Sequence, residues 1–166
     1  MTFATAFGRD PFRPHDHRRC REAVRAAVEA DCRERGLRLT PARACVLDAL
    51  LESHRALTAY ELLDRLRKAG LGQQPPAAYR ALEFLVANGF AHRIERLGAY
   101  VACVHGGASH CAAFLVCRAC RRVAEAALDE PEQALAAKAE SVGFQVERVV
   151  VEAEGICETC GRAANG

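Results

Sequence analysis

The sequence has no uninterrupted apolar run of the roughly 18 residues that a membrane-spanning helix needs. Its N-terminal segment lacks the apolar stretch of a secretory signal. The chain contains neither the HExxH motif of zinc hydrolases nor the HxE and PCxxC pair of zinc deaminases. These absences predict a cytoplasmic protein that is not an enzyme, contacts no membrane and has no small-molecule substrate.

Apart from two CxxC pairs, the sequence has no internal repeat and no low-complexity segment. Its 166 residues suit one domain or two small ones, and a change of pattern near residue 112 favours two. Residues 1–90 carry 15 Lys and Arg against 11 Asp and Glu, whereas residues 91–166 carry 8 against 10. The basic first half is compatible with nucleic-acid binding.

Helix start signals recur through the first half of the chain. A helix is expected around residues 18–35, and Thr40 with Pro41 provides the cap and first residue of a second helix. Thr58 and Glu61 have the spacing of a capping box at the start of a third. We expect residues 1–16 to form a mobile N-terminal tail and residues 162–166 to be mobile as well.

A fourth helix is expected to begin at the proline pair 75–76, and a hairpin with its turn near Gly98 follows. This order of elements predicts a winged helix-turn-helix domain over residues 17–104. The fourth helix would enter the DNA major groove, and its apolar stripe leaves Tyr79, Arg80 and Glu83 on the outer surface. Arginine can contact guanine through two hydrogen bonds, so Arg80 is a candidate for base recognition.

The sequence pattern of residues 112–166 predicts a small α+β domain. Two short strands surround the first CxxC, a helix begins near Pro131 and ends near Gly143, and a long strand is expected over 144–155. About 55 residues offer little core, so a metal clip and a partner subunit would both stabilise this domain. The fold class is therefore α+β, with an N-terminal winged-helix domain followed by a small α/β dimerisation domain.

The two CxxC pairs predict a closed zinc site, because four thiolates fill the tetrahedron of a zinc ion and leave no position for chemistry. A thioredoxin-like redox role would need a CxxC at a helix N-terminus after a strand, and the pattern does not predict one. We interpret this four-cysteine zinc site as structural. Its ligands would be Cys117, Cys120, Cys157 and Cys160.

A second group of possible ligands lies at the junction of the two halves. Its members are His92, Cys103, His105, His110, Cys111 and Glu125. Zinc accepts mixed sulfur, nitrogen and oxygen ligands, and occupancy of a site at a hinge over residues 105–111 could fix the orientation of the two domains. The segment His15 to Cys20 could also bind metal, but its place in the tail favours an incidental arrangement. Cys20, Cys32 and Cys45 are interpreted as small apolar or spare thiols.

Five segments, in order and spacing, resemble the ferric uptake regulator family, and most closely its zinc uptake regulator branch. The likeness runs from about Asp31 to Gly161. The segments are RLTPARACVLDALLE, LTAYELLDRLR, PPAAYRALEFLVANGFAHRIE, CRACRRVAE and GICETCG.

The resemblance implies a zinc-loaded homodimer that represses zinc-uptake genes by binding palindromic operators in double-stranded DNA. It implies two zinc ions per chain, a structural one on the four cysteines and a sensory one on His92, Cys103, His110 and Glu125. On the DNA side it points to Tyr60 and Arg80, with Tyr79 as a further candidate. An iron- or peroxide-sensing regulator of the same family, or a zinc-stapled interaction module without DNA binding, remains the alternative. His105 or Cys111 could replace a sensory ligand.

The sequence departs from the family pattern in two places. Ala77 and Ala78 stand where the family usually has Thr-Val, so a threonine contact to the operator backbone would be absent. The His-x-His cluster of the iron and peroxide branches is reduced to Ser-His-Cys at residues 109–111. The second departure favours zinc and removes one further metal site.

Overall fold

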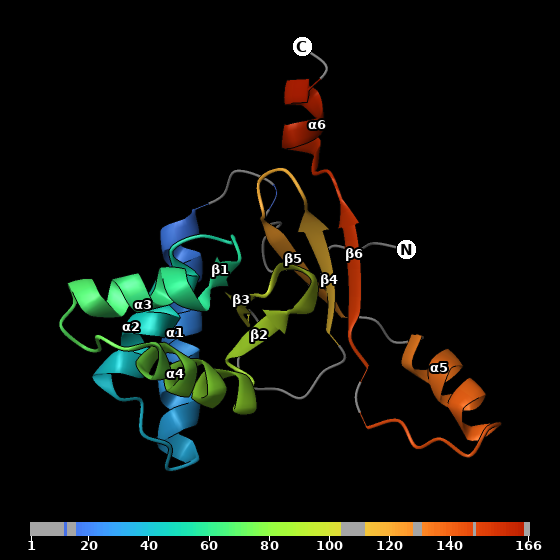
Figure 1. Ribbon diagram of the computed structural model, residues 1–166, viewed down its shortest axis with the longest axis horizontal. Helices are drawn as coiled ribbons and strands as arrows, with labels where there is room; N and C mark the ends of the chain where they lie inside the picture. Colours follow the sequence, from blue (N-terminus) through green and yellow to red (C-terminus); the bar gives the residue numbers. More distant parts are fainter. Residues whose placement is uncertain (1–11, 13–15, 104–111, 128–130, 148, 165–166) are drawn as a thin grey trace.

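The computed structural model describes residues 12, 16–103, 112–127, 131–147 and 149–164 (Figure 1). The first part contains α1 (His17–Glu34), α2 (Pro41–Leu51), β1 (Leu57–Thr58), α3 (Ala59–Lys68), α4 (Pro75–Ala87), β2 (Ala91–Ile94), the 3-10 turn η1 (Glu95–Leu97) and β3 (Ala99–Ala102). The second part contains β4 (Ala112–Cys117), β5 (Val123–Ala127), α5 (Pro131–Glu140), β6 (Val151–Gly155) and α6 (Glu158–Ala164). The predicted α+β class is confirmed. Within the described residues, no helix has the length and apolar character needed to cross a membrane.

The helix starts that the sequence predicts are present. The Thr40 hydroxyl accepts from the Arg43 backbone N–H ahead of α2 at 3.4 Å. At α3 the Thr58 hydroxyl accepts from the Glu61 N–H at 3.3 Å, while the Glu61 carboxylate accepts from the Thr58 N–H at 2.7 Å. This reciprocal capping box satisfies two backbone donors that a helix N-terminus otherwise leaves unpaired.

The wing is a three-stranded antiparallel sheet in the order β1-β3-β2. Its hairpin turns at η1, and Gly98 closes it in the left-handed region at φ 54°. Apolar residues of α1 to α4 and the start of β2 form the core below the wing. The largest fully buried members are Phe90, Leu47, Leu50, Leu62, Leu63, Leu66, Leu82 and Leu85. This core fixes α4 against α2 and α3, so the exposed face of α4 has a set position.

The second sheet has the order β5-β4-β6, with β4 antiparallel to β5 and parallel to β6. Phe114 in the central strand pairs with Glu125 on one side and with Glu152 on the other. Side chains that are paired across strands lie on the same face, so these three form one row.

The prediction of a long strand over 144–155 is wrong in its first half, because only Val151–Gly155 is a strand. The paired residues of β4 span only Ala113–Cys117 opposite β6, so among the described residues no strand of this sheet pairs with the segment before Val151. Phe144 is 66% exposed there. Apolar, β-prone sequence alone does not make a strand without a partner.

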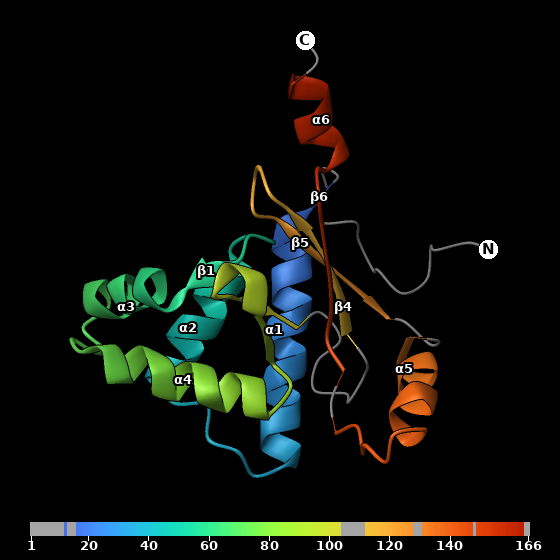
Figure 2. The ribbon, with the colours of Figure 1, turned by 45° about the vertical axis from the view of Figure 1, so that its right-hand side comes forward.

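The two helices of the second part lie at its periphery. In Figure 1 α5 stands beyond β6, and in both views α6 extends past the end of that strand (Figures 1 and 2). The helix α6 corrects the expectation of a mobile tail from residue 162, since it continues to Ala164. Its Gly161 N–H donates to the Cys157 carbonyl at 2.9 Å, so the second CxxC begins this helix.

The wing packs directly on the second sheet. A small core joins them, consisting of Ala56, Ile94, Ala99 and Val101 from the first part with Phe114, Val116 and Val123 from the second. The Glu152 carboxylate accepts from the backbone N–H groups of Glu95 at 2.7 Å and Arg96 at 3.1 Å. The Arg96 guanidinium also pairs with Glu154 at 2.8 Å. We call these contacts of Glu152 and Glu154 the wing clamp. The expected hinge, residues 105–111, lies outside the described residues.

Candidate metal centres and DNA-binding surface

The four cysteines of the CxxC pairs lie together. Cys117 ends β4, Cys157 follows the end of β6, and Cys160 is in α6. Because β4 and β6 are parallel and Cys117 pairs with Gly155, both CxxC turns leave the same end of the sheet. One sulfur from each of the four residues lies within 4.8 Å of the others.

The electrostatics of this cluster favour a cation. Burial alone would raise the pKa of Cys117, but backbone N–H groups of Cys157, Cys120 and Ala119 lower it to about 6. Proton sharing with Cys157, followed by burial, raises the pKa of Cys160 to about 12. The fold therefore stabilises one thiolate while a neighbouring thiol keeps its proton. A bound divalent cation would stabilise the deprotonated form of all four sulfurs, since thiolates are the form that coordinates metal. The donor set fits zinc.

A second cluster bridges the wing and the second sheet. His92 lies in β2, Cys103 directly follows β3, and Glu125 lies in β5. The His92 Nε2 is 3.1 Å from a Glu125 carboxylate oxygen, and the Cys103 sulfur is 3.9 Å from the same oxygen. Cys103 is fully buried, and Glu125 is a buried carboxylate with 5% exposure. We call these three residues the hinge cluster.

The hinge cluster has the composition of a metal site. Burial alone would lower the pKa of His92, but hydrogen bonds to Cys103 and Glu125 raise it to about 9. A proton on the imidazole thus compensates acidic groups that are otherwise buried without a cation. One nitrogen, one sulfur and one oxygen ligand fit zinc with a position left for a fourth ligand.

The fourth sensory ligand predicted by the sequence, His110, lies outside the described residues. His105 and Cys111, its predicted competitors, lie outside them too. The assignment of His110 therefore stays a prediction.

A third cluster was not predicted. His17 and Cys20 of α1 lie next to His54, which precedes β1, and one ligand atom from each is within 4.8 Å of the others. The position of the segment His15 to Cys20 in the expected tail had favoured an incidental arrangement. The His-x-x-Cys spacing, which places His17 and Cys20 on one face of a helix, was a signal for these two residues. No local pattern indicated that His54 would lie beside them.

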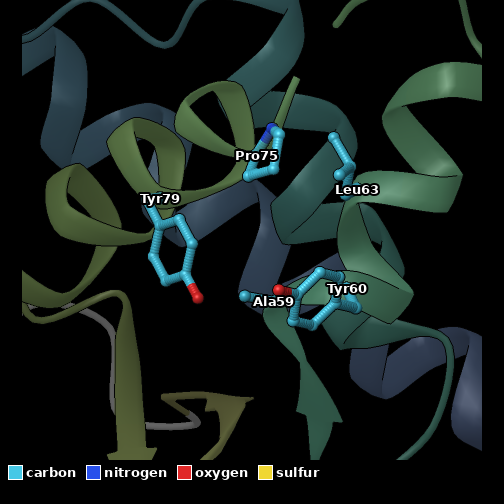
Figure 3. Close-up of a pocket in the computed structure, with 5 residues that line it drawn as sticks. All are labelled: Ala59, Tyr60, Leu63, Pro75 and Tyr79. Atoms are coloured by element: carbon cyan, nitrogen blue, oxygen red, sulfur yellow. The ribbon is translucent and has the colours of Figure 1, made fainter. Parts of the chain in front are cut away.

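The DNA-binding candidates belong to α3 and α4, two helices that lie on the side of the molecule away from the second sheet (Figure 1). Tyr60, in the first turn of α3, is 70% exposed, and Tyr79 of α4 is 44% exposed. Arg80 is exposed on the same turn of α4. Figure 3 shows the two tyrosines beside a shallow hollow that Ala59, Leu63 and Pro75 complete. Exposed aromatic rings and a guanidinium on adjacent helices are suited to phosphate and base-edge contacts.

These features define a winged-helix protein whose second domain has a four-cysteine site and whose domain joint has a mixed metal-binding cluster. The sequence profile of the ferric uptake regulator family matches residues 34–154. The chain belongs to this family.

Several known proteins are similar to the chain over most of its length. The zinc uptake regulation protein of Escherichia coli (strain K12) is 38% identical over 136 residues, which is 81% of this chain and 80% of that protein. A solved zinc uptake regulator in complex with zinc and DNA is 35% identical, superposes with a TM-score of 0.82, and matches 88% of this chain and 98% of its own.

A further similar protein, XcZur, has been solved in two forms. The holo form is 43% identical with a TM-score of 0.76, and the match covers 86% of this chain and 99% of XcZur. The apo form, with the same coverage, has a TM-score of 0.50. At nearly equal sequence identity, the arrangement of the present chain thus resembles the holo form more than the apo form.

Proposed function

We propose that this protein is a zinc-responsive transcriptional repressor that binds the operators of zinc-uptake genes as a zinc-loaded homodimer. The observation that carries this proposal is the hinge cluster. Its ligands come from the wing, through His92 and Cys103, and from the second sheet, through Glu125. A zinc ion coordinated there would link the DNA-reading part of the chain to the other domain.

Contacts around the hinge cluster hold its ligands in position. Phe114 packs against the His92 ring at 5.1 Å between centroids, and the Cys103 N–H donates to the Phe90 carbonyl at 3.0 Å. Both contacts restrict the orientation of ligands at the joint, and the surrounding apolar core excludes water. Zinc supplies the positive charge that lets these buried acidic ligands remain deprotonated. We propose His110 as the fourth ligand.

The four-cysteine site has a different proposed role. It is a closed zinc site that holds the ends of β4 and β6 together, so this site and the hinge cluster would together hold two zinc ions per chain. Because a structural zinc site contributes folding energy, this site would remain filled while the hinge cluster responds to zinc availability. The proposed domain boundaries follow from these roles, with a winged helix over residues 17–104, a hinge over 105–111 and a dimerisation domain from residue 112.

The second domain has a surface that suits a partner subunit. Six large apolar side chains of its described residues are exposed, which are Leu115, Leu135, Val142, Phe144, Val150 and Ile156. A partner subunit that covered them would remove this apolar area from water. A symmetric dimer would present two copies of α4 to the two halves of a palindromic operator, with Arg80 at base edges and Tyr60 and Tyr79 at the backbone or thymine methyl groups.

The experiment that tests the proposal is a zinc titration of DNA binding. Purified protein is mixed with labelled promoter DNA of a zinc-transporter gene from the same genome, and anisotropy is recorded at fixed salt as free zinc increases. We expect affinity to rise with zinc for the wild type. Cys103→Ala should remain a folded dimer with about one zinc fewer per chain and should no longer gain affinity. Normal zinc response by Cys103→Ala would overturn the assignment of the sensory site, and zinc-independent binding would overturn the function.

A further inference from the structure

A third group of metal-binding side chains lies at the N-terminal end of α1. We propose that His17, Cys20 and His54 form a separate site for a borderline-soft divalent cation such as zinc. None of these residues belongs to the two sites described above, and the proposal does not depend on DNA binding.

The fold brings the three ligands together from two segments of the chain. His17 is the first residue of α1 and Cys20 lies one turn later, so both side chains lie on the same face of the helix. His54 lies in the loop between α2 and β1. The rings of the two histidines are 4.7 Å apart between centroids, at an interplanar angle of 64°.

The surroundings of these ligands are those of a built site rather than a mobile surface. All three side chains are half-buried, and both ring nitrogens of His17 are shielded from solvent. Asp16 is bound as the N-cap of α1, where its carboxylate accepts from the Arg19 N–H at 3.3 Å. The start of the helix is therefore fixed independently of any metal.

The donor set selects the kind of ligand. Two imidazoles and one thiolate are typical zinc ligands, whereas calcium and magnesium prefer oxygen. Tetrahedral coordination places such donor atoms roughly 3.3–3.6 Å apart, given zinc–nitrogen and zinc–sulfur bonds of about 2.0 and 2.3 Å. The donor atoms here lie within 4.8 Å of one another, so side-chain rotation alone can close the site. Three protein ligands leave one position for water.

The position of His54 connects this site to the domain joint. Its backbone carbonyl accepts from the Val123 N–H at 2.9 Å, and the Ala56 N–H donates to the Arg121 carbonyl at 3.1 Å. Val123 begins β5, and Glu125 of the hinge cluster follows two residues later. A cation on His54 would therefore fix the loop that holds β5 against the winged helix.

Metal binding by the full-length protein tests the proposal. Wild type, Cys20→Ser and His54→Asn are dialysed against the same excess of free zinc, and the bound metal is counted by elemental analysis. Cys45→Ser is the matched control, because Cys45 is a half-buried thiol of α2 outside the three clusters of the described residues. We expect wild type and Cys45→Ser to hold one more zinc per chain than the other two variants. Equal zinc in Cys20→Ser and Cys45→Ser would overturn the site.

A second measurement separates metal binding from any effect of the substitutions on folding. The alkylation rate of Cys20 is followed by peptide mass spectrometry, with and without zinc, in wild type and in His54→Asn. Zinc should slow alkylation of Cys20 at least tenfold in wild type and leave it unchanged in His54→Asn. An unchanged rate in wild type would show that Cys20 does not bind the metal.

Discussion

The wing clamp allows the packing between wing and second sheet to be weakened without changing any proposed metal ligand. Glu152 touches none of the hinge cluster residues in the contacts described above, yet its carboxylate holds the two backbone N–H groups at the start of η1. Glu152→Ala removes both hydrogen bonds and leaves every proposed metal ligand in place. The substitution should weaken the packed arrangement of wing and second sheet.

The size of the effect follows from the contacts. A hydrogen bond to a charged group contributes about 1.5–3 kcal/mol, but here both donors belong to exposed residues that water can reach. We therefore assign the pair about 2 kcal/mol in total. Because 1.4 kcal/mol is a factor of ten, zinc binding that must first close the joint should weaken by up to about 30-fold. Glu152→Gln keeps one acceptor oxygen and should show an intermediate loss.

The assay is a competition titration of the second zinc equivalent against a chromophoric chelator. Glu147→Ala is the matched control, since it removes an exposed carboxylate from the same domain. The control should bind zinc like wild type. If Glu152→Ala and Glu147→Ala have equal zinc affinity, the clamp does not contribute to closing the joint, and the link between domain packing and metal binding is wrong.

Four further predictions follow from other parts of the molecule. Cys157→Ala leaves three thiolates, so we expect loss of the dimer by sizing and a large fall in thermal midpoint. Arg80→Ala should cost about 1–3 kcal/mol of specific operator binding in a gel-shift assay with zinc content unchanged. Thr58→Ala loses the capping box and should lower the free energy of unfolding by about 1 kcal/mol in urea. In the metal-free protein, hydrogen bonds raise the pKa of His92 from 6.5 to about 9 against the opposing effect of burial. Its contribution to stability should therefore be complete below pH 6.5 and disappear as pH rises through 9, measured against His92→Gln.

The N-terminal half was largely predictable because its signals are local. Thr40, Thr58 and Glu61 mark helix starts through hydrogen bonds to residues three positions away, and Gly98 marks a turn within one hairpin. The spacing of Leu62 and Leu66 predicts the buried face of α3. Such signals depend on a few neighbouring residues, so they can be interpreted without the rest of the fold.

The second half was less predictable because its structure depends on contacts between distant residues. The strand β6 is limited to the residues that β4 can pair, which no local pattern indicates. The wing clamp joins Glu152 to a turn more than 50 residues earlier. In the first half, the cluster of His17, Cys20 and His54 likewise joins segments more than 30 residues apart in the sequence. The sequence showed which residue types can bind metal, but it did not show which of them lie close together in the fold.

The register of the second sheet connects the four-cysteine site to the domain joint. Both CxxC turns leave the same end of the parallel pair β4 and β6, so a metal that holds them fixes how these strands align. In that alignment Phe114 pairs with Glu125 on one side and Glu152 on the other, and all three face the wing. A slip by one residue would turn a strand's side chains to the opposite face of the sheet. If β6 slipped in this way, Glu152 would no longer present an acceptor to η1. A metal on the four cysteines would therefore fix the alignment of the strand that carries the wing clamp.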